Sequence, residues 1–598
     1  MTGCVLAATG FDSGPLLLAL AVIAIGSGAT WLLLARRRAR RDGRRGSLAA
    51  FAAIPLLVIA LLASGGLAPA PAQAAEPCPT GTAAAPATQT PAPAPTPTPT
   101  ETATPVDYTP GAAGIGDPYY PLDGNGGYDV QHYGLDLAYA PATDVLSGTV
   151  TVTALATQNL SAFNLDFDTR EADGSDSIVI SAVTVNGAAA DWSLATTQIS
   201  KDSGQPQLPG STDDDATPPR TELTVIPHAG LPTGSTITTT VTYSGVPIEV
   251  DDAFGPAGVF RTPTGAVIVG QPRVAATWFP ANDHPSDKAT FSTKMTVPDG
   301  LQVIGNGRLA SQQSANGQTT WDWEMEKPMA TYLATATVGD YRIDAETDAA
   351  TGITYYDAID PALFTREAEG GGATVGDVAT SIFATEPQVI AFLEKSFGDY
   401  PFSEAGGIAI GEIGTGDDLP YALENQTRPI YPAWSFPADA DASVVVHELA
   451  HQWYGDSVSM ERWSDIWLNE GFATYAEWLW TEDQTGFTPQ QEFDAYYADP
   501  TDGDASDDAA FWATVVADPG AAGIFDSAVY TRGAMTLQAL RNEVGDTAFF
   551  AILKGWASEK GGTSASTAEF EAYAEQVSGQ DLDALFTAWL HTGAKPAL

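Results

Sequence analysis

At 598 residues the chain is too long for one ordinary hydrophobic core, so two or three domains are expected. Its 74 acidic residues against 26 basic ones give a formal net charge of −48, and such a surface repels nucleic acids and anionic membranes, so neither is an expected partner. The two cysteines, Cys4 and Cys78, are too few for a disulfide framework or a thiolate metal site.

The N-terminal region has the organisation of an export signal. One apolar segment, at about residues 15–35, is long enough to cross a bilayer, and a cluster of arginines follows it. A second apolar segment, at about residues 48–67, is followed by Ala72-Gln73-Ala74, which is the layout of a secretory signal peptide. Because arginines stay on the cytoplasmic side, we expect residues 1–75 to be an export region that combines an anchor-like segment with a signal peptide. The rest of the protein would then be extracellular, either secreted or held on the outer face of the cytoplasmic membrane.

The beginning of the chain leaves open how such an anchor would work. The order of Leu6-Ala7-Ala8-Thr9-Gly10, an apolar segment and arginines resembles a cell-wall sorting signal with Ala in place of Pro. A membrane or cell-wall tether and a cleaved signal peptide are both compatible with it. Residues 76–108 are mostly Ala, Thr and Pro, so we expect an extended, semi-rigid linker there.

The rest of the chain has two halves with different periodicity. Segments rich in Val, Thr and Ile with turn residues between them predict an antiparallel, β-sandwich-like domain over residues 109–345. These segments are Ser147–Ala154, Ile178–Val185, Glu222–Ile226 and Thr236–Tyr243. Apolar residues at helical spacing predict a mainly helical, thermolysin-like domain over residues 346–598. The expected helices are Ser381–Phe397, Ser443–Tyr454, Ser464–Trp480, Tyr530–Val544 and Thr567–Val577. The predicted fold class is therefore α+β and multidomain.

The segment His447-Glu448-Leu449-Ala450-His451 carries the strongest chemical signal. Histidines four positions apart lie on one face of a helix, so both imidazoles can bind one ion, and Glu448 points beside that ion. A catalytic zinc takes a third protein ligand and leaves its fourth position to water, and Glu470 on the next amphipathic helix can supply that ligand. A structural zinc usually has four protein ligands, often cysteines, which are lacking here. The pattern predicts one catalytic Zn²⁺.

Further motifs stand in a fixed order around this site. Eighteen residues separate His451 from Glu470, which lies in the segment Trp467–Ala473. Together with Tyr421–Asn425, Tyr530–Ala534, Gly270-Gln271 and the stretch Trp278–Phe291, this order resembles the aminopeptidase N family of gluzincin zinc metallopeptidases. The segment Tyr421-Ala422-Leu423-Glu424-Asn425 is similar to that family's Gly-Ala-Met-Glu-Asn exopeptidase motif. The resemblance covers the chain from about residue 117 to its end.

The resemblance implies a role for each matching residue. The zinc ligands would be His447, His451 and Glu470. Glu448 would be the general base that activates the zinc-bound water and later protonates the leaving amine. Tyr530 would stabilise the oxyanion. Glu424, helped by Gln271, would bind the substrate's free α-ammonium and leave no room for preceding residues. The implied substrates are therefore peptides with a free N-terminus.

The chain departs from the family pattern at several positions. Tyr421 and Leu423 replace the Gly and Met of the exopeptidase motif, which puts the first specificity pocket in doubt. Arg273 stands where many relatives carry a second amine-binding acid, which weakens the expectation for Gln271. Only 598 − 530 = 68 residues follow Tyr530, so we expect a short bacterial-type form without the C-terminal helical domain and with a more open cleft.

The function expected from these residues is that of an exported zinc aminopeptidase, with its active site between the β domain and the helical domain. Two alternatives remain. A zinc endopeptidase would require that Glu424 does not face the substrate. An inactive binding module would retain only the shape, although the complete set of ligands, base and tyrosine argues against it.

Overall fold

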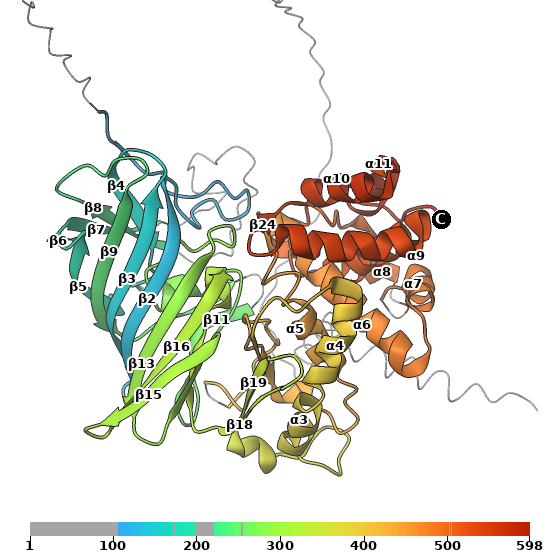
Figure 1. The fold of residues 1–598 in the computed structure, drawn as a ribbon, viewed down its shortest axis with the longest axis horizontal. Coiled ribbons are helices and arrows are strands. Elements are labelled where there is room, and N and C mark those ends of the chain that lie inside the picture. Colours follow the sequence, from blue (N-terminus) through green and yellow to red (C-terminus); the bar gives the residue numbers. More distant parts are fainter. Residues whose placement is uncertain are drawn as a thin grey trace, which may run out of the picture. The chain divides into compact units, whose positions relative to one another are not determined.

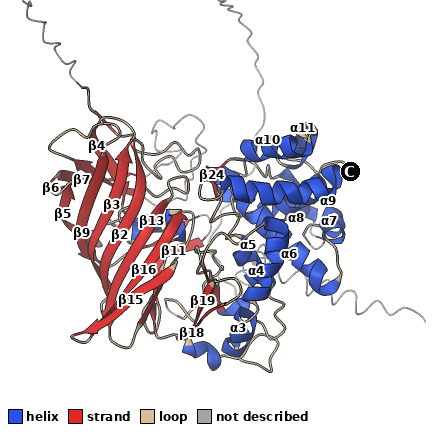
Figure 2. Ribbon diagram, viewed as in Figure 1, coloured by secondary structure: helices blue, strands red, loops and turns tan. Residues whose placement is uncertain are grey.

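The computed structural model describes residues 106–171, 174–197, 220–252, 255–414, 416–501, 503 and 505–598. The expected export region and nearly all of the expected linker lie outside these residues. Residues 107–598 belong to one compact unit, in which a region rich in β-sheet is followed by a region rich in helix (Figure 2). The α+β fold class predicted from the sequence is therefore confirmed.

The largest sheet of the β-rich region has eight strands, which lie side by side in Figure 1. In spatial order they are β15 (Arg308–Ala315), β16 (Gln318–Met329), β13 (Ala289–Pro298), β2 (Tyr128–Ala140), β3 (Val145–Ala156), β9 (Thr236–Gly245), β5 (Ile178–Val185) and β6 (Ala188–Ala189). All neighbours are antiparallel except the parallel pair β2 and β13. Buried residues alternate with exposed or half-buried ones along β2 and β13, which is the period-2 pattern of a sheet with one face in the core.

Two smaller sheets complete this region. One is antiparallel, in the order β10 (Glu249–Asp252), β11 (Gly255–Arg261), β12 (Ala266–Val269), β17 (Ala336–Gly339) and β14 (Gln302–Gly305). The other is β1 (Thr109–Pro110), β4 (Leu160–Asp166), β8 (Arg220–Ile226) and β7 (Asp191–Thr197). Each of the four strands predicted from the sequence coincides with β3, β5, β8 or β9 within a few residues.

The helix-rich region also contains a mixed sheet, in the order β18 (Arg342–Thr347), β19 (Thr354–Ile359), β21 (Ile408–Ile410) and β22 (Ile430–Pro432), with β20 (Glu404–Ala405) beside β19. A short parallel pair joins β23 (Ser459–Met460) to β24 (Ser564–Ala565). The helices are α3 (Val375–Phe383), α4 (Glu386–Phe397), α5 (Ser443–Ala450), α6 (Trp467–Thr485), α7 (Pro489–Ala498), α8 (Ala505–Ala513), α9 (Ser527–Lys560), α10 (Thr567–Ser578) and α11 (Asp583–Trp589). Among the helices of the described residues, none combines the length and apolarity needed to span a bilayer.

Four of the predicted helices have different bounds in the structure. The expected helix Tyr530–Val544 lies within the longer α9, which is kinked at Gly545. The expected single helix Ser381–Phe397 is two helices, because Pro387 has no N–H to donate and is tolerated only in the first turn of α4. The expected helix Ser443–Tyr454 ends at Ala450, where the chain turns back. The expected helix Ser464–Trp480 begins as the 3₁₀ turn Trp463–Asp465, and α6 follows it.

The β-rich region contacts the helix-rich region through buried polar groups. Asp117 accepts a hydrogen bond from the backbone N–H of Trp463, at 3.0 Å, in the turn that leads into α6. The same carboxylate oxygen lies 3.2 Å from Nε2 of His284. The start of α6 is therefore fixed by two residues of the β-rich region.

Candidate metal centre and active site

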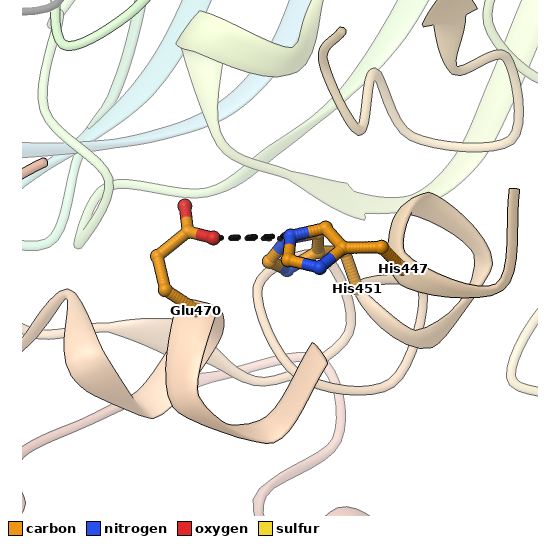
Figure 3. A group of neighbouring side chains, drawn as sticks. All are labelled: His447, His451 and Glu470. Carbon is orange, nitrogen blue, oxygen red and sulfur yellow. Dashed lines mark hydrogen bonds and ion pairs between the residues drawn. The ribbon is translucent and has the colours of Figure 1, made fainter. Parts of the chain in front are cut away.

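The two predicted metal-binding histidines share one helix face. His447 is in the last turn of α5, and His451 caps that helix while keeping helical dihedral angles. Glu470 is in the first turn of α6. One potential ligand atom from each of these residues lies within 4.8 Å of the others, and all three side chains are buried. Figure 3 shows both imidazole rings turned toward the carboxylate of Glu470.

The hydrogen bonds of the two rings fix which nitrogen faces the centre. Nε2 of His447 lies 3.2 Å, and Nε2 of His451 lies 3.4 Å, from Oε2 of Glu470. On the outer side, Nδ1 of His447 is 2.7 Å from Oε1 of Glu477, and Nδ1 of His451 is 3.0 Å from the carbonyl oxygen of Tyr454. Because a carbonyl only accepts, Nδ1 of His451 carries the proton and its Nε2 lone pair is free for a metal.

This donor set fits zinc. Two imidazole nitrogens and one carboxylate are a ligand set of catalytic zinc sites, and each histidine has the outer acceptor that such ligands require. Burial opposes ionisation of Glu470, but the adjacent His451 and the hydrogen bond from His447 lower its pKa to about 2. Glu470 therefore stays a carboxylate, which is the form that binds metal.

Glu448, between the two histidines in sequence, is buried beside the same centre. Burial raises its pKa to about 8, although the neighbouring His447 and His451 act in the opposite direction. A bound dication would lower this pKa. A carboxyl group that exchanges its proton near neutral pH suits general base and general acid catalysis.

Close helix packing brings Tyr530 to the metal ligands. A Cβ added to Gly471 on α6 would lie 2.9 Å from the backbone of Gly533 on α9, so the two helices touch where a larger residue would separate them. Tyr530, one turn before Gly533, lies near Glu470, whose negative charge adds to the rise in the pKa of the phenol. Its ring stacks on His447 with 6.2 Å between ring centroids. Burial raises the pKa of this phenol well above its usual range, so it remains a neutral donor.

Glu424 lies in the loop between β21 and β22 and is buried against the same centre. Its carboxylate, that of Glu448 and the imidazole of His451 each place one atom within 4.8 Å of the others. The hydroxyl of Tyr332 donates to Oε1 of Glu424 at 2.9 Å, and the amide of Gln452 donates to its backbone carbonyl at 3.2 Å. Burial raises the pKa of Glu424, and the neighbouring His451 opposes that effect.

Gln271 follows β12 and is buried, and its Oε1 atom has no hydrogen-bond partner among the described residues. A Cβ on the preceding residue, Gly270, would lie 3.4 Å from the hydroxyl of Tyr421, three positions before Glu424. The segment thus adjoins the Glu424 loop, while a role for Gln271 in binding the substrate amine stays a prediction. Arg273 does not reach the centre, because it forms a buried ion pair with Asp168 at 3.0 Å.

Sequence reasoning missed two side chains of the site. Glu477, which accepts from His447, lies seven positions after Glu470 on α6, and that spacing of two helical turns could have identified it. Tyr332, which bonds Glu424, comes from the turn after β16 and is 92 positions away along the chain. No spacing rule connects it with the site.

The fold and the site together define a zinc metallopeptidase. The family models that match the chain are the peptidase family M1 domain, over residues 431–589, and the peptidase M1 N-terminal domain, over residues 259–333. Both the β-rich region and the helix-rich region therefore match models of the M1 peptidase family.

Among solved structures, the M1 zinc metallopeptidase of Deinococcus radiodurans is 28% identical, with a TM-score of 0.65. That match covers 81% of this chain and 99% of the relative. Among curated proteins, aminopeptidase N of Streptomyces lividans is 28% identical over 52% of this chain, and aminopeptidase M1-D of Oryza sativa subsp. japonica is 29% identical over 54%. The matched part is 36% of each of these two proteins, so the chain spans about a third of their length.

Proposed function

We propose that the protein is an exported zinc aminopeptidase that removes single residues from the free N-termini of peptides. The observation that carries the proposal is the placement of Glu424. Its buried carboxylate is grouped with Glu448 and His451 and is held by Tyr332. A carboxylate in that place binds an α-ammonium beside the reacting bond, which an internal segment of a polypeptide cannot offer.

Each residue of the site has one task in this reaction. Zinc held by His447, His451 and Glu470 would polarise the scissile carbonyl and lower the pKa of a bound water. Glu448 takes the proton of that water and returns it to the leaving amine. Tyr530 donates a hydrogen bond to the carbonyl oxygen as negative charge develops on it. Glu424 anchors the amine and so fixes which peptide bond reaches Glu448.

The relatives support this substrate class. A mutant of the Deinococcus radiodurans peptidase was solved with the substrate Tyr-Ser-Ala, at 27% identity to this chain and a TM-score of 0.64. A two-domain M1 peptidase mutant was solved with L-tryptophan, again with a TM-score of 0.64. A free amino acid in that relative is what a site for one N-terminal residue would hold.

The test compares an aminoacyl fluorogenic substrate with its N-acetylated twin. The acetyl cap removes the positive charge and adds bulk at Glu424, so we expect cleavage of the free amine only. A Glu424→Ala variant should mainly raise KM for free-amine substrates, because an ammonium anchor acts on ground state and transition state alike. Equal cleavage of the two substrates by the wild-type protein would favour an endopeptidase. Zinc loading without cleavage of either would favour a binding module.

Export is the second part of the proposal, and the order of arginines, apolar segment and Ala72-Gln73-Ala74 supports it. Residues 1–110 fused to a reporter that is active only after export should give activity. The same fusion with all seven arginines of residues 36–45 replaced by Gln is the control, because it removes the positive charge that sets orientation. A cytoplasmic, uncleaved fusion product would contradict this part while leaving the peptidase unaffected.

A further inference from the structure

The loop that follows the second zinc-binding histidine is packed tightly against that residue. His451 donates from Nδ1 to the carbonyl of Tyr454, and its own carbonyl accepts from the backbone N–H of Asp456 at 2.9 Å. Gly455 between them has φ +133°, and a Cβ there would lie 3.2 Å from Nδ1 of His451. A shift of this loop therefore moves the acceptor that orients the His451 ring.

A lysine of the β-rich region holds the same loop. Nζ of Lys288 donates to the carbonyl oxygens of Asp456 at 2.6 Å and of Ser457 at 2.8 Å. Those carbonyls lie two and three positions after the carbonyl of Tyr454. The Lys288 side chain thus links the β-rich region to the turn whose Tyr454 carbonyl accepts from His451.

The base of this side chain is itself fixed. Asp287, directly before Lys288, accepts the backbone N–H of Val130 on β2 at 3.1 Å and also a hydrogen bond from the amide of Asn282. Lys288 in turn directly precedes β13, which pairs with β2. The backbone that carries Lys288 is therefore held by the large sheet, and a donor on a fixed backbone can hold a loop better than one on a mobile segment.

We propose that Lys288 is a positioning residue for the zinc ligand His451. It holds the carbonyls of Asp456 and Ser457, and through that turn it keeps the Tyr454 carbonyl on Nδ1 of His451. Outer partners of metal-binding histidines fix ring orientation and ligand basicity, so loss of Lys288 should weaken zinc retention. The proposal rests on the zinc site and is independent of whether the substrate is a free-amine peptide.

A purely structural role for Lys288 makes a different prediction. The loop has hydrogen bonds of its own, from Gly455 N–H to the Val458 carbonyl and from Val458 N–H to the Trp453 carbonyl. The Ser457 carbonyl also accepts from the backbone N–H of Gly562 at 2.8 Å. If those bonds were sufficient, loss of the lysine would lower thermal stability and leave His451 in place.

The test measures zinc loss from purified, zinc-loaded protein to an excess of a chromogenic chelator, without substrate. Lys288→Met keeps most of the length of the unbranched side chain and removes the donors. We expect zinc loss to be about 10-fold faster, the lower end of the range for loss of an outer partner, because Lys288 acts on His451 only through the Tyr454 carbonyl. Lys288→Arg, which can donate to both carbonyls, should restore most of the wild-type rate. Peptidase activity at saturating zinc should show a lower kcat, because His451 lies at the reacting centre.

Lys294→Met is the matched control. Lys294 lies on β13, is half exposed and pairs with Asp322 at 3.8 Å, far along the strand from the loop. Its replacement should leave zinc loss unchanged. Should Lys288→Met not fold, Lys288→Gln is measured in the same way, with faster zinc loss again expected. Zinc loss at the wild-type rate from a folded Lys288 variant, or failure of Lys288→Arg to restore it, would overturn the proposal.

Discussion

Nδ1 of His447 lies 2.7 Å from Oε1 of Glu477, and both side chains are buried. The two residues come from α5 and α6, the helices that also carry the other zinc ligands. The carboxylate therefore orients the imidazole and strengthens Nε2 as a donor on the opposite side of the ring.

Glu477→Gln should weaken zinc binding by about 10- to 100-fold, because an amide orients the ring but does not increase its basicity. Competition with a chelator of known affinity measures this. Asp483→Asn is the control, since Asp483 is on the same helix but exposed. An unchanged zinc affinity in Glu477→Gln would show that the contact is without influence on the metal.

Glu448→Gln should retain zinc and lose most of its turnover, by about a hundred- to ten-thousandfold, because an amide cannot accept the proton of the attacking water. Steady-state kinetics and metal analysis of the same sample measure the two effects. Loss of zinc along with activity would instead make Glu448 part of the metal-binding set.

Tyr530→Phe should reduce kcat by roughly a hundred- to a thousandfold, the usual effect of removing one oxyanion donor, with little change in KM. Tyr573→Phe is the control, because that phenol bonds Glu559 on α9 instead of a metal ligand. Turnover close to wild type in Tyr530→Phe would mean that another group stabilises the oxyanion.

Glu222 should make stability depend on pH. Glu222 on β8 lies opposite Asp166 on β4 in the sheet. Burial raises the pKa of Glu222 from 4.5 to about 7. Between these two values the folded state binds a proton that the unfolded state does not, so Glu222 makes stability fall as pH rises through this window. Above about pH 7 the whole loss of stability caused by Glu222 is present.

Glu222→Gln should therefore increase the free energy of unfolding at about pH 8 by roughly 1–3 kcal/mol, since one pKa unit corresponds to about 1.4 kcal/mol, and should have little effect near pH 4.5. Urea unfolding at both values measures the difference. Glu461→Gln, at an exposed position, is the control. Equal effects of Glu222→Gln at the two pH values would contradict the raised pKa of Glu222 in the folded state.

The sequence by itself determined the residues of the metal site and the order of the two regions. His447 and His451 are four positions apart, so local helical geometry brings these two side chains together. Glu470 opens the next helix and joins them because α6 packs against α5. The strands were also predictable, because their richness in Val, Thr and Ile and the turn residues between them are local features of the sequence.

Only the tertiary structure decided what surrounds the ligands. Tyr332 bonds Glu424 across 92 positions of the chain, and Lys288 bonds Asp456 across 168. Asp117 bonds Trp463 across 346 positions. Such contacts depend on how sheets and helices pack, and a single sequence carries no periodic signal for them. The break between α3 and α4 was visible locally as Pro387, but the turn after Ala450 was not, because its position depends on Gly455 fitting against His451.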